Sequence, residues 1–448
     1  MRRLTALAGT LFIASIANSG ALDSEEFQNN WPQWRGPEMN GVAANSNPPT
    51  EWSEEKNVKW KVDLPGYGHA SPIVWEDKIF VLSAINTEGA DRTAEPEEEE
   101  AEEPGDRRRR RNVNPDGIYE FAVLALNRND GAVAWKKTAC QLLPHEGTHR
   151  DGSWASSSPV TDGEHVFAFF GSRGVYCYDL EGNEVWQKDL GDMTIKMGFG
   201  EGSSPALYGD TLIVNWDHEE DSFIVALDKN TGDEKWRVPR DERTSWSTPL
   251  IVDLNGKPQV IVSATSRIRS YALADGALLW ECGGMTGNVI PAPVTKDGIA
   301  YIMSGFRGAA LKAIDLSKAS GDVTDGEAIV WERDKDTPYV PSPLLFDNHL
   351  YFLKTNDGIL SCLDADTGEP RFAAERLSDV RGVYSSPVGA GGVVYIVGRE
   401  GMALVLKKGE FEVVATNTLE DQFSASPAIV GDEIILRGHE SLYCIAED

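Results

Sequence analysis

The chain has 448 residues, with 42 Lys+Arg against 71 Asp+Glu and a formal net charge of −29 at pH 7. A balance this acidic argues against a nucleic-acid binder and against electrostatic docking on anionic lipid, since both need a cationic face. A hydrophobic content of 41% with 13 Trp is enough for a sizeable core, which excludes wholesale disorder. Length alone predicts two or three domains, unless one repetitive fold takes most of the chain.

The N-terminus has the pattern of a secretory signal. Two arginines follow the initial methionine, an apolar stretch runs over 4–17, and Ser19 and Ala21 place the expected cut after Ala21. A second cut after Ala17 stays open. After this stretch no apolar run reaches membrane-spanning length. We therefore expect a signal peptide at 1–21 and an exported, soluble mature protein in the periplasm or the medium, without a transmembrane segment.

A small residue followed by proline recurs before an apolar strand throughout the chain. The pairs are Ser71-Pro72, Ser158-Pro159, Ser204-Pro205, Thr248-Pro249, Ala292-Pro293, Ser342-Pro343, Ser386-Pro387 and Ser426-Pro427. Their spacing is regular except for the first interval, which contains an insertion. Self-similarity at a fixed period predicts one repeat architecture rather than separate domains.

Each period also repeats an internal order of four short strands. The apolar run after the proline is followed by a turn, a β-rich strand, a third strand ending in an Ala-Leu-Asp-like triplet, a glycine turn and a strand that carries Trp. The clearest copy is 226–236, and related copies end at Trp135, Trp186, Trp280, Trp331 and Phe372. Four alternating strands per period are typical of propeller blades.

The two ends of the chain complete each other. The last period stops after three strands, while 58–62 reads as an orphan fourth strand ahead of the first Ser-Pro pair. Pairing the two would leave no edge in the ring. The predicted fold class is therefore an all-β, eight-bladed β-propeller of four-stranded blades, in one domain over 52–448, preceded by a leader segment at 22–51.

The turn before the fourth strand carries the motif Ala-x-Asp-x-x-Thr-Gly-x-x-x-Trp. Residues 226–236 match it at every fixed position, and 362–368 match it with Cys in place of Ala. The motif resembles the tryptophan-docking repeat of PQQ-type (quinoprotein) propellers, and Trp-Pro-Gln-Trp-Arg-Gly-Pro at 31–37 is similar to the leader of exported PQQ-like propellers of planctomycete-type bacteria. The resemblance implies a fold but no activity, because the same repeat builds catalytic dehydrogenases and a non-enzymatic propeller of the outer-membrane assembly machinery.

The five cysteines are too few and too scattered for a disulfide framework, and no two are adjacent. In the repeat frame Cys177, Cys362 and Cys444 occupy a position that holds alanine in other copies. A position that accepts Ala or Cys predicts a small buried strand site rather than a redox site. We likewise expect the repeated tryptophans to pack one blade against the next.

A charged insertion at 88–117 interrupts the first blade. It holds a Glu-rich stretch over 95–103 and an arginine run over 107–111. We expect a disordered, solvated loop, because neighbouring glutamates partly neutralise the arginines. A partner or surface tether is the alternative.

The sequence His-Glu-Gly-Thr-His at 145–149 matches the HExxH zinc motif. Zinc binding by this motif needs a helix that brings both histidines to one face. Here Pro144 precedes it, a glycine lies inside it, and the repeat phase places it in a loop between blades. We therefore expect no zincin site, although a loop metal site formed by His145, His149 and Asp151 stays open.

The loops before each Ser-Pro pair lead into the innermost strand and should line one mouth of the central channel. They are rich in aromatic and charged side chains, which makes a ligand site there a reasonable expectation. The candidate binding residues are His69, His149, Arg150, Asp151, Trp154, Phe199, Glu201, Arg240, Arg243, Trp246, Tyr339, Arg381, Tyr384 and Phe423. The alternative is that these residues have no binding role, because side chains line the channel mouth of every propeller.

We expect a non-catalytic, exported, monomeric propeller that binds or scaffolds a protein, peptide or glycan in the cell envelope, without nucleic acid, metal or cofactor. The alternative is a PQQ-dependent dehydrogenase-like oxidoreductase. By resemblance such enzymes carry a vicinal cysteine disulfide beside the quinone, a Trp floor, a calcium held by acidic and amide side chains, and an Asp base. No adjacent cysteines occur here. A hydrolase or lyase using Glu201, Asp151, His149 or Arg243 is a third possibility.

Overall fold

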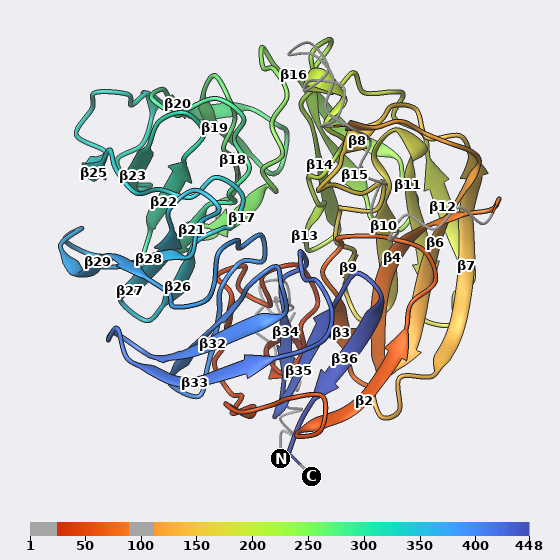
Figure 1. Ribbon diagram of the computed structural model, residues 1–448. Helices are drawn as coiled ribbons and strands as arrows, with labels where there is room; N and C mark the ends of the chain where they lie inside the picture. Colours follow the sequence, from red (N-terminus) through yellow and green to blue (C-terminus); the bar gives the residue numbers. More distant parts are fainter. Residues whose placement is uncertain (1–24, 89–111, 448) are drawn as a thin grey trace, which may run out of the picture.

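The strands form a ring of eight blades around a central channel, which confirms the predicted propeller (Figure 1). The computed structural model describes residues 25–88 and 112–447. The expected signal peptide and most of the charged insertion lie outside these ranges. Every blade has four antiparallel strands. In the first seven blades these strands follow one another along the chain, whereas the last blade takes its fourth strand from the N-terminal part of the chain. One repeated fold therefore accounts for the length that suggested several domains.

In each of the first four blades the strands follow one another from the channel outward. Blade 1 contains β3 (Ile73–Trp75), β4 (Lys78–Asn86), β6 (Tyr119–Asn127) and β7 (Val133–Leu142). Blade 2 contains β9 (Val160–Thr161), β10 (His165–Phe169), β11 (Val175–Asp179) and β12 (Glu184–Lys188). Blade 3 contains β13 (Ala206–Tyr208), β14 (Thr211–Trp216), β15 (Phe223–Asp228) and β16 (Glu234–Pro239). Blade 4 contains β17 (Leu250–Asp253), β18 (Pro258–Val262), β19 (Ile268–Ala272) and β20 (Leu278–Cys282), with β24 (Gly321–Asp322) parallel to β20.

The other four blades follow the same order. Blade 5 contains β21 (Val294–Lys296), β22 (Ile299–Ser304), β23 (Ala310–Asp315) and β25 (Ile329–Arg333). Blade 6 contains β26 (Leu344–Phe346), β27 (His349–Leu353), β28 (Ile359–Asp364) and β29 (Pro370–Arg376). Blade 7 contains β30 (Val388–Ala390), β31 (Val393–Val397), β32 (Met402–Lys407) and β33 (Val413–Thr418), with β1 (Val42–Ala43) parallel to β30. Blade 8 contains β34 (Ala428–Val430), β35 (Glu433–Arg437), β36 (Ser441–Ile445) and β2 (Val58–Asp63).

The N-terminal strand β2 completes the last blade, as predicted. It runs antiparallel to β36, with Trp60 opposite Cys444 and Val62 opposite Leu442 (Figure 1). The remaining described elements are short: α1 (Glu25–Gln28), the 3₁₀ turns η2 (Gly171–Arg173) and η3 (Lys196–Gly198), and a pair formed by β5 (Asn112–Val113) and β8 (Thr148–His149). At the C-terminal end of the insertion expected at 88–117, Asn112 and Val113 form β5 and pair with β8, so this described part is not a disordered loop.

A tryptophan on the fourth strand locks five of the eight blades to the next one. The Trp186 indole Nε1 donates to the carbonyl oxygen of Lys229 in the next blade at 2.7 Å, and a Cβ on Gly232 would lie 2.7 Å from the indole ring. Only glycine fits this turn, because its φ of +74° and the close ring both exclude a side chain. The same two contacts, an indole hydrogen bond and a glycine against the ring, recur at Trp60, Trp135, Trp236 and Trp331.

The small residue on the third strand faces the aromatic residue of the fourth. In strand register the pairs include Ala226 with Trp236, Cys177 with Trp186, Cys362 with Phe372, and Cys444 with Trp60. A larger side chain would displace the ring from its turn, which explains why this position holds Ala or Cys. All five cysteines are free thiols, and all except Cys140 are buried.

The small residue before each proline links neighbouring blades around the channel. The Ser71 backbone N–H donates to Ser158 Oγ at 2.9 Å, and the Ser426 N–H donates to Ser71 Oγ at 2.8 Å, which joins the last blade to the first. Equivalent bonds join Ser158 to Ser204, Ser204 to Thr248, Ala292 to Ser342, Ser342 to Ser386, and Ser386 to Ser426. We call this circle the serine ring. Among these positions only Ala292 cannot accept a bond, because its side chain is a methyl group.

The leader ahead of β2 contacts the far ends of the innermost strands. Trp31 forms an isolated antiparallel bridge with Val74 of blade 1, and the Pro32 carbonyl oxygen accepts a hydrogen bond from Thr161 N of blade 2 at 2.8 Å. On the other side of the ring, the Leu345 N–H of blade 6 donates to a leader carbonyl. The leader therefore lies across the channel at the end away from the loops that precede the Ser-Pro pairs.

Two leader side chains reach into the channel. Arg35 is 1% exposed, and its Nη1 and Nη2 donate to the carbonyl oxygens of Pro387 and Pro343 at 2.7 and 2.5 Å. Trp34 Nε1 donates to Ser426 Oγ at 3.4 Å, so the leader contacts the serine ring from its own end of the channel. We conclude that the leader closes this end of the channel.

Candidate functional site

A cavity of about 410 Å³ lies at the open mouth of the channel, on the side away from the leader. Its walls come from the loops between successive blades and from the loops between second and third strands. The lining residues are His69, Thr148, His149, Asp151, Gly152, Ser156, Phe199, Gly200, Glu201, Gly202, Trp246, Ile290, Phe306, Tyr339, Val340, Asn356, Tyr384 and Ser424. This volume lies within the range of small-ligand sites.

The wall formed by blades 3 to 6 is aromatic. The Trp246 ring is held in place because its Nε1 donates to the Gly200 carbonyl oxygen at 2.7 Å. Phe306 and Tyr339 pack with ring centroids 4.9 Å apart at 31°. Phe199 completes this wall beside the histidine loop, with its centroid 5.3 Å from that of His149. We call this part of the cavity the aromatic half.

The opposite wall, from blades 6, 7, 8 and 1, is polar. Arg399 Nη1 donates to Asp151 Oδ1 at 2.9 Å, and the Tyr384 hydroxyl donates to Asp151 Oδ2 at 3.3 Å. Although burial alone would raise it, the Arg399 guanidinium holds the pKa of the Asp151 carboxyl below its usual value. Arg399 also stacks over the Tyr384 ring at 4.5 Å. We call this part the polar end.

Two histidines extend the polar end. His69 Nε2 and the Tyr67 hydroxyl lie 2.9 Å apart, and the His69 and His439 rings stack with centroids 5.1 Å apart. His439 Nε2 in turn lies 3.1 Å from Ser424 Oγ, which faces the cavity. Burial, together with the nearby Arg399 and other arginine charge, lowers the pKa of His439 to about 4. His439 is therefore neutral at physiological pH.

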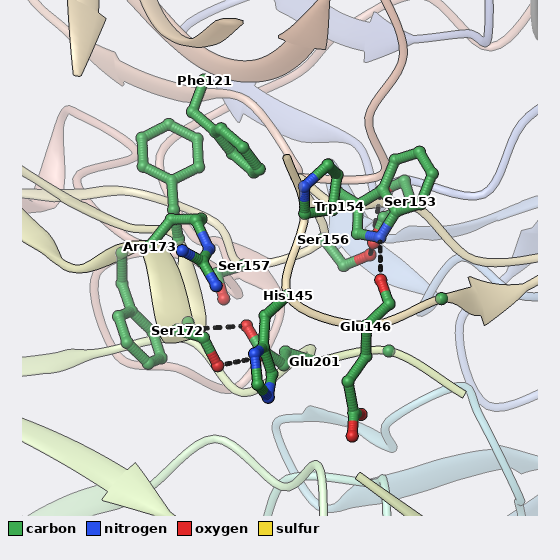
Figure 2. A pocket seen from close by; sticks show the side chains of 16 residues that line it. Phe121, His145, Glu146, Ser153, Trp154, Ser156, Ser157, Ser172, Arg173 and Glu201 are labelled. Carbon is green, nitrogen blue, oxygen red and sulfur yellow. Dashed lines mark hydrogen bonds between the residues drawn. The ribbon is translucent and has the colours of Figure 1, made fainter. Parts of the chain in front are cut away.

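Glu201 lines both this cavity and a small pocket of about 30 Å³, whose side chains are drawn in Figure 2. Its carboxylate accepts a hydrogen bond from Ser172 N at 2.9 Å and a second from the Ser172 hydroxyl. Burial raises the pKa of Glu201 to about 7, against the lowering effect of these bonds. In the same pocket Trp154 Nε1 donates to the Glu146 carbonyl oxygen at 2.9 Å.

Eight of the fourteen candidate residues lie along the cavity and six do not. Trp154 lines the small pocket instead. Arg150, Arg243 and Arg381 are exposed on the surrounding loops. Arg240 was wrongly expected to line the cavity, because its fully buried side chain donates to Asp217 at 2.7 Å. Phe423 is also displaced, since its side chain is 0% exposed and packs in the core beside Tyr443.

The sequence reasoning missed the residues from the loops between second and third strands. These loops contribute Phe306 and Asn356 to the lining, and they carry Arg399, which contacts the lining residues Asp151 and Tyr384. These loops contain no recurring Ser-Pro pair, so the repeat pattern does not identify them as part of the channel mouth. The alternation of blade strands could have found them, because the second and third strands of a hairpin meet at the same end of the blade as the loops before the Ser-Pro pairs.

The HExxH stretch is not helical, as predicted. Residues 145–147 form a bend and a loop, and 148–149 form β8. His145 Nδ1 lies 3.6 Å from Asp192, whereas His149 Nδ1 lies 3.5 Å from Asp151. The two histidines therefore have different carboxylate neighbours, and the arrangement does not fit a zincin site.

The cavity also does not fit a calcium-bound quinone. Calcium takes six to eight oxygen ligands, but Asp151 is held by Arg399 and Tyr384, and Glu201 is held by Ser172. Within residues 25–88 and 112–447, the one group of three potential metal ligands is Asp162, Glu164 and His165, outside the cavity, where Lys229 pairs with the Asp162 carboxylate. None of the cysteines lines the cavity.

Residues 120–374 match the sequence model of the family described as "Outer membrane protein assembly factor BamB". A relative of that description from Yersinia pestis is 21% identical over 337 residues, which are 70% of this chain and 77% of the relative. The structure of BamB from Moraxella catarrhalis covers 74% of this chain and 92% of its own, at 14% identity and a TM-score of 0.53.

A quinohemoprotein alcohol dehydrogenase from Comamonas testosteroni covers 95% of this chain and 82% of its own, at 10% identity and a TM-score of 0.64. At these identities the solved structures share the fold alone. In the described part of the chain, no helix has the length and apolar character to cross a membrane. Because the family match takes in more than half of the chain, this PQQ-like propeller belongs to the family described as Outer membrane protein assembly factor BamB.

Proposed function

We propose that this protein is an exported, non-catalytic propeller that binds a segment of a polypeptide partner in the cell envelope through the cavity at its open mouth. The observation that carries the proposal is the cavity itself, with an aromatic half pinned around Trp246 and a polar end built on Asp151 and Arg399. Such a site offers burial for a side chain and hydrogen bonds for a backbone. Export rests on the signal-like N-terminus.

The side chains at the polar end favour binding over catalysis. A general base must reach a substrate proton, and a nucleophile needs an adjacent base. Asp151 already accepts from Arg399 and Tyr384, and Glu201 accepts from Ser172 on the side of the small pocket. Both carboxylates thus have structural partners that hold them in place.

Photo-cross-linking tests the site directly. A benzophenone amino acid at Tyr339 should cross-link to a polypeptide from an envelope extract, and the product can be identified by mass spectrometry. The matched control carries the same group at Phe411, which is 37% exposed on the outside of the ring. Trp246→Ala should reduce the cross-link at 339 several-fold. Equal cross-linking from both positions would contradict the proposal, and a captured glycan would show that the ligand is not a peptide.

The protein is also proposed to work without a quinone. Addition of PQQ with calcium to the purified mature protein should leave the melting temperature unchanged and give no quinone absorbance after gel filtration, because the donor set of the cavity does not fit the ion. A saturable rise in melting temperature would instead favour the dehydrogenase-like alternative.

A further inference from the structure

Five consecutive blades each contribute one aromatic side chain to the lining of the mouth cavity. Phe199 precedes blade 3, Trp246 precedes blade 4 and Phe306 belongs to blade 5, while Tyr339 and Tyr384 precede blades 6 and 7. We call these five rings the aromatic belt. The face of an aromatic ring carries partial negative charge, so it attracts a cation as well as an alkyl group. The described lining contains no lysine or arginine of its own.

The polar atoms of the aromatic belt are bound within the protein. Trp246 Nε1 donates to the Gly200 carbonyl oxygen at 2.7 Å, and the Tyr384 hydroxyl donates to Asp151 Oδ2 at 3.3 Å. The two phenylalanines have no polar atoms. The belt therefore offers a ligand ring surface rather than hydrogen-bond donors, which suits a cation that carries alkyl groups.

The lining also contains two carboxylates, and one of them lies beside Trp246. Asp151 is already paired, because Arg399 Nη1 donates to its Oδ1 at 2.9 Å. Glu201 lies between two glycines that both approach the indole. The Gly200 carbonyl oxygen accepts the indole bond, and a Cβ on Gly202 would lie 3.3 Å from the ring. The backbone thus places Glu201 at the edge of the aromatic belt.

Glu201 is held by neutral donors. Its carboxylate accepts hydrogen bonds from the Ser172 N–H at 2.9 Å and from the Ser172 hydroxyl. Arg173 favours the charged form of Glu201 less than Ser172 does, and it is itself paired with Asp192 at 3.0 Å. Glu146 acts in the opposite sense. A buried carboxylate held in this way is stabilised by a cation placed beside it.

We propose that the mouth cavity takes an organic ammonium cation, with its alkyl groups against the aromatic belt and its charge beside Glu201. This inference rests on the proposed binding function of the cavity and names the chemical group that is bound. A free amine and a lysine side chain of a polypeptide share this chemistry, and the probes below distinguish the two sources. The volume of about 410 Å³ has room for either.

Choline and 3,3-dimethylbutan-1-ol test the charge at constant shape, because they differ only in a nitrogen cation for a carbon. Calorimetric titration at pH 8, above the pKa of about 7 of Glu201, keeps that carboxylate charged. We expect choline to bind at least about tenfold more tightly than the alcohol, since the rings and the carboxylate attract only the charged member of the pair.

A peptide pair tests the second source in the same way. One probe is acetyl-Ala-(Nε-trimethyllysine)-Ala amide, and the other has a tert-butyl group in place of the trimethylammonium. Tighter binding of the charged peptide than of choline would identify a polypeptide side chain as the source, and the reverse would identify a free amine. If neither cation binds more tightly than its neutral counterpart, the ammonium proposal is overturned. Cross-linking at position 339 then decides the proposed polypeptide function separately.

Two substitutions assign the preference to the proposed groups. Trp246→Leu keeps an apolar side chain but removes the ring, and Glu201→Gln keeps the shape but removes the charge. We expect each to reduce the preference for choline over the neutral alcohol several-fold. Phe411→Leu is the control, since it changes a ring that is 37% exposed on the outside of the propeller and should keep the tenfold preference. An unchanged preference in both cavity variants would overturn the proposal.

Discussion

Arg35 in the leader donates a 2.7 Å hydrogen bond to the carbonyl oxygen of Pro387, although 352 positions separate the two residues. The bond ties the leader to the innermost strand of blade 7, and a second bond ties it to Pro343 of blade 6. Burial lowers the pKa of the guanidinium, which is the cost of holding a cation there with backbone oxygens alone. The leader is therefore an integral part of the ring.

Arg35→Ala should destabilise the protein by roughly 2–4 kcal/mol, because it leaves two buried carbonyl groups without donors and opens a cavity. Chemical unfolding measures the change. Arg376→Ala is the control, since Arg376 is exposed on the outer strand of blade 6 and should cost less than about 0.5 kcal/mol. Equal stability of the two variants would mean that the leader does not hold the ring.

Gly232→Ala should cost about 1–3 kcal/mol more than Gly256→Ala. Both glycines have similar positive φ values, +74° and +76°, so both substitutions carry the same backbone strain. Only at Gly232 would the new Cβ collide with a ring, that of Trp186, whereas no atom lies within 4 Å at Gly256. Thermal unfolding of the pair isolates the docking contact, and indistinguishable variants would argue against it.

Ala292→Ser should stabilise the ring by roughly 0.5–1.5 kcal/mol, because its hydroxyl could accept from Thr248 N–H and complete the serine ring. Ser342→Ala is the complementary change, since it removes the acceptor for Ala292 N at 2.9 Å and should destabilise. Urea unfolding of both variants checks the sign. A loss of stability in Ala292→Ser would show that this part of the ring has no room for an oxygen.

Glu201 predicts a pH dependence of stability. Its folded pKa of about 7 lies above the unfolded value of 4.5, so the folded state holds a proton that the unfolded state has lost between these two values. Stability attributable to this group therefore falls as pH rises from 4.5 to 7 and stays lower above. Glu201→Gln should be more stable than the natural sequence by roughly 1–3 kcal/mol at pH 8 and about equal to it at pH 4. A difference that does not change with pH would contradict the shift.

The repeat made the ring and its closure predictable, because the Ser-Pro pairs and the tryptophan motif each encode a contact between neighbouring blades. The site was predictable only in part. Sequence placed Trp246, Tyr339 and Asp151 in the correct loops, but it could not tell that Asp217 draws Arg240 into the interior. The position of Arg35 in the channel could not be predicted either, because it binds backbone carbonyl oxygens. Every residue has such an oxygen, so no residue type in the sequence marks the partner.

The binding role of the cavity is tested most directly by the indole N–H resonance of Trp246. In ¹⁵N-labelled protein this resonance can be assigned by its loss in Trp246→Phe, and titration with the polypeptide segment that cross-links at position 339 should move it saturably. The docking tryptophans, such as Trp186 and Trp331, should stay in place because they lie between blades. A shift confined to those tryptophans, or no saturable shift of Trp246 with any polypeptide ligand, would contradict the account.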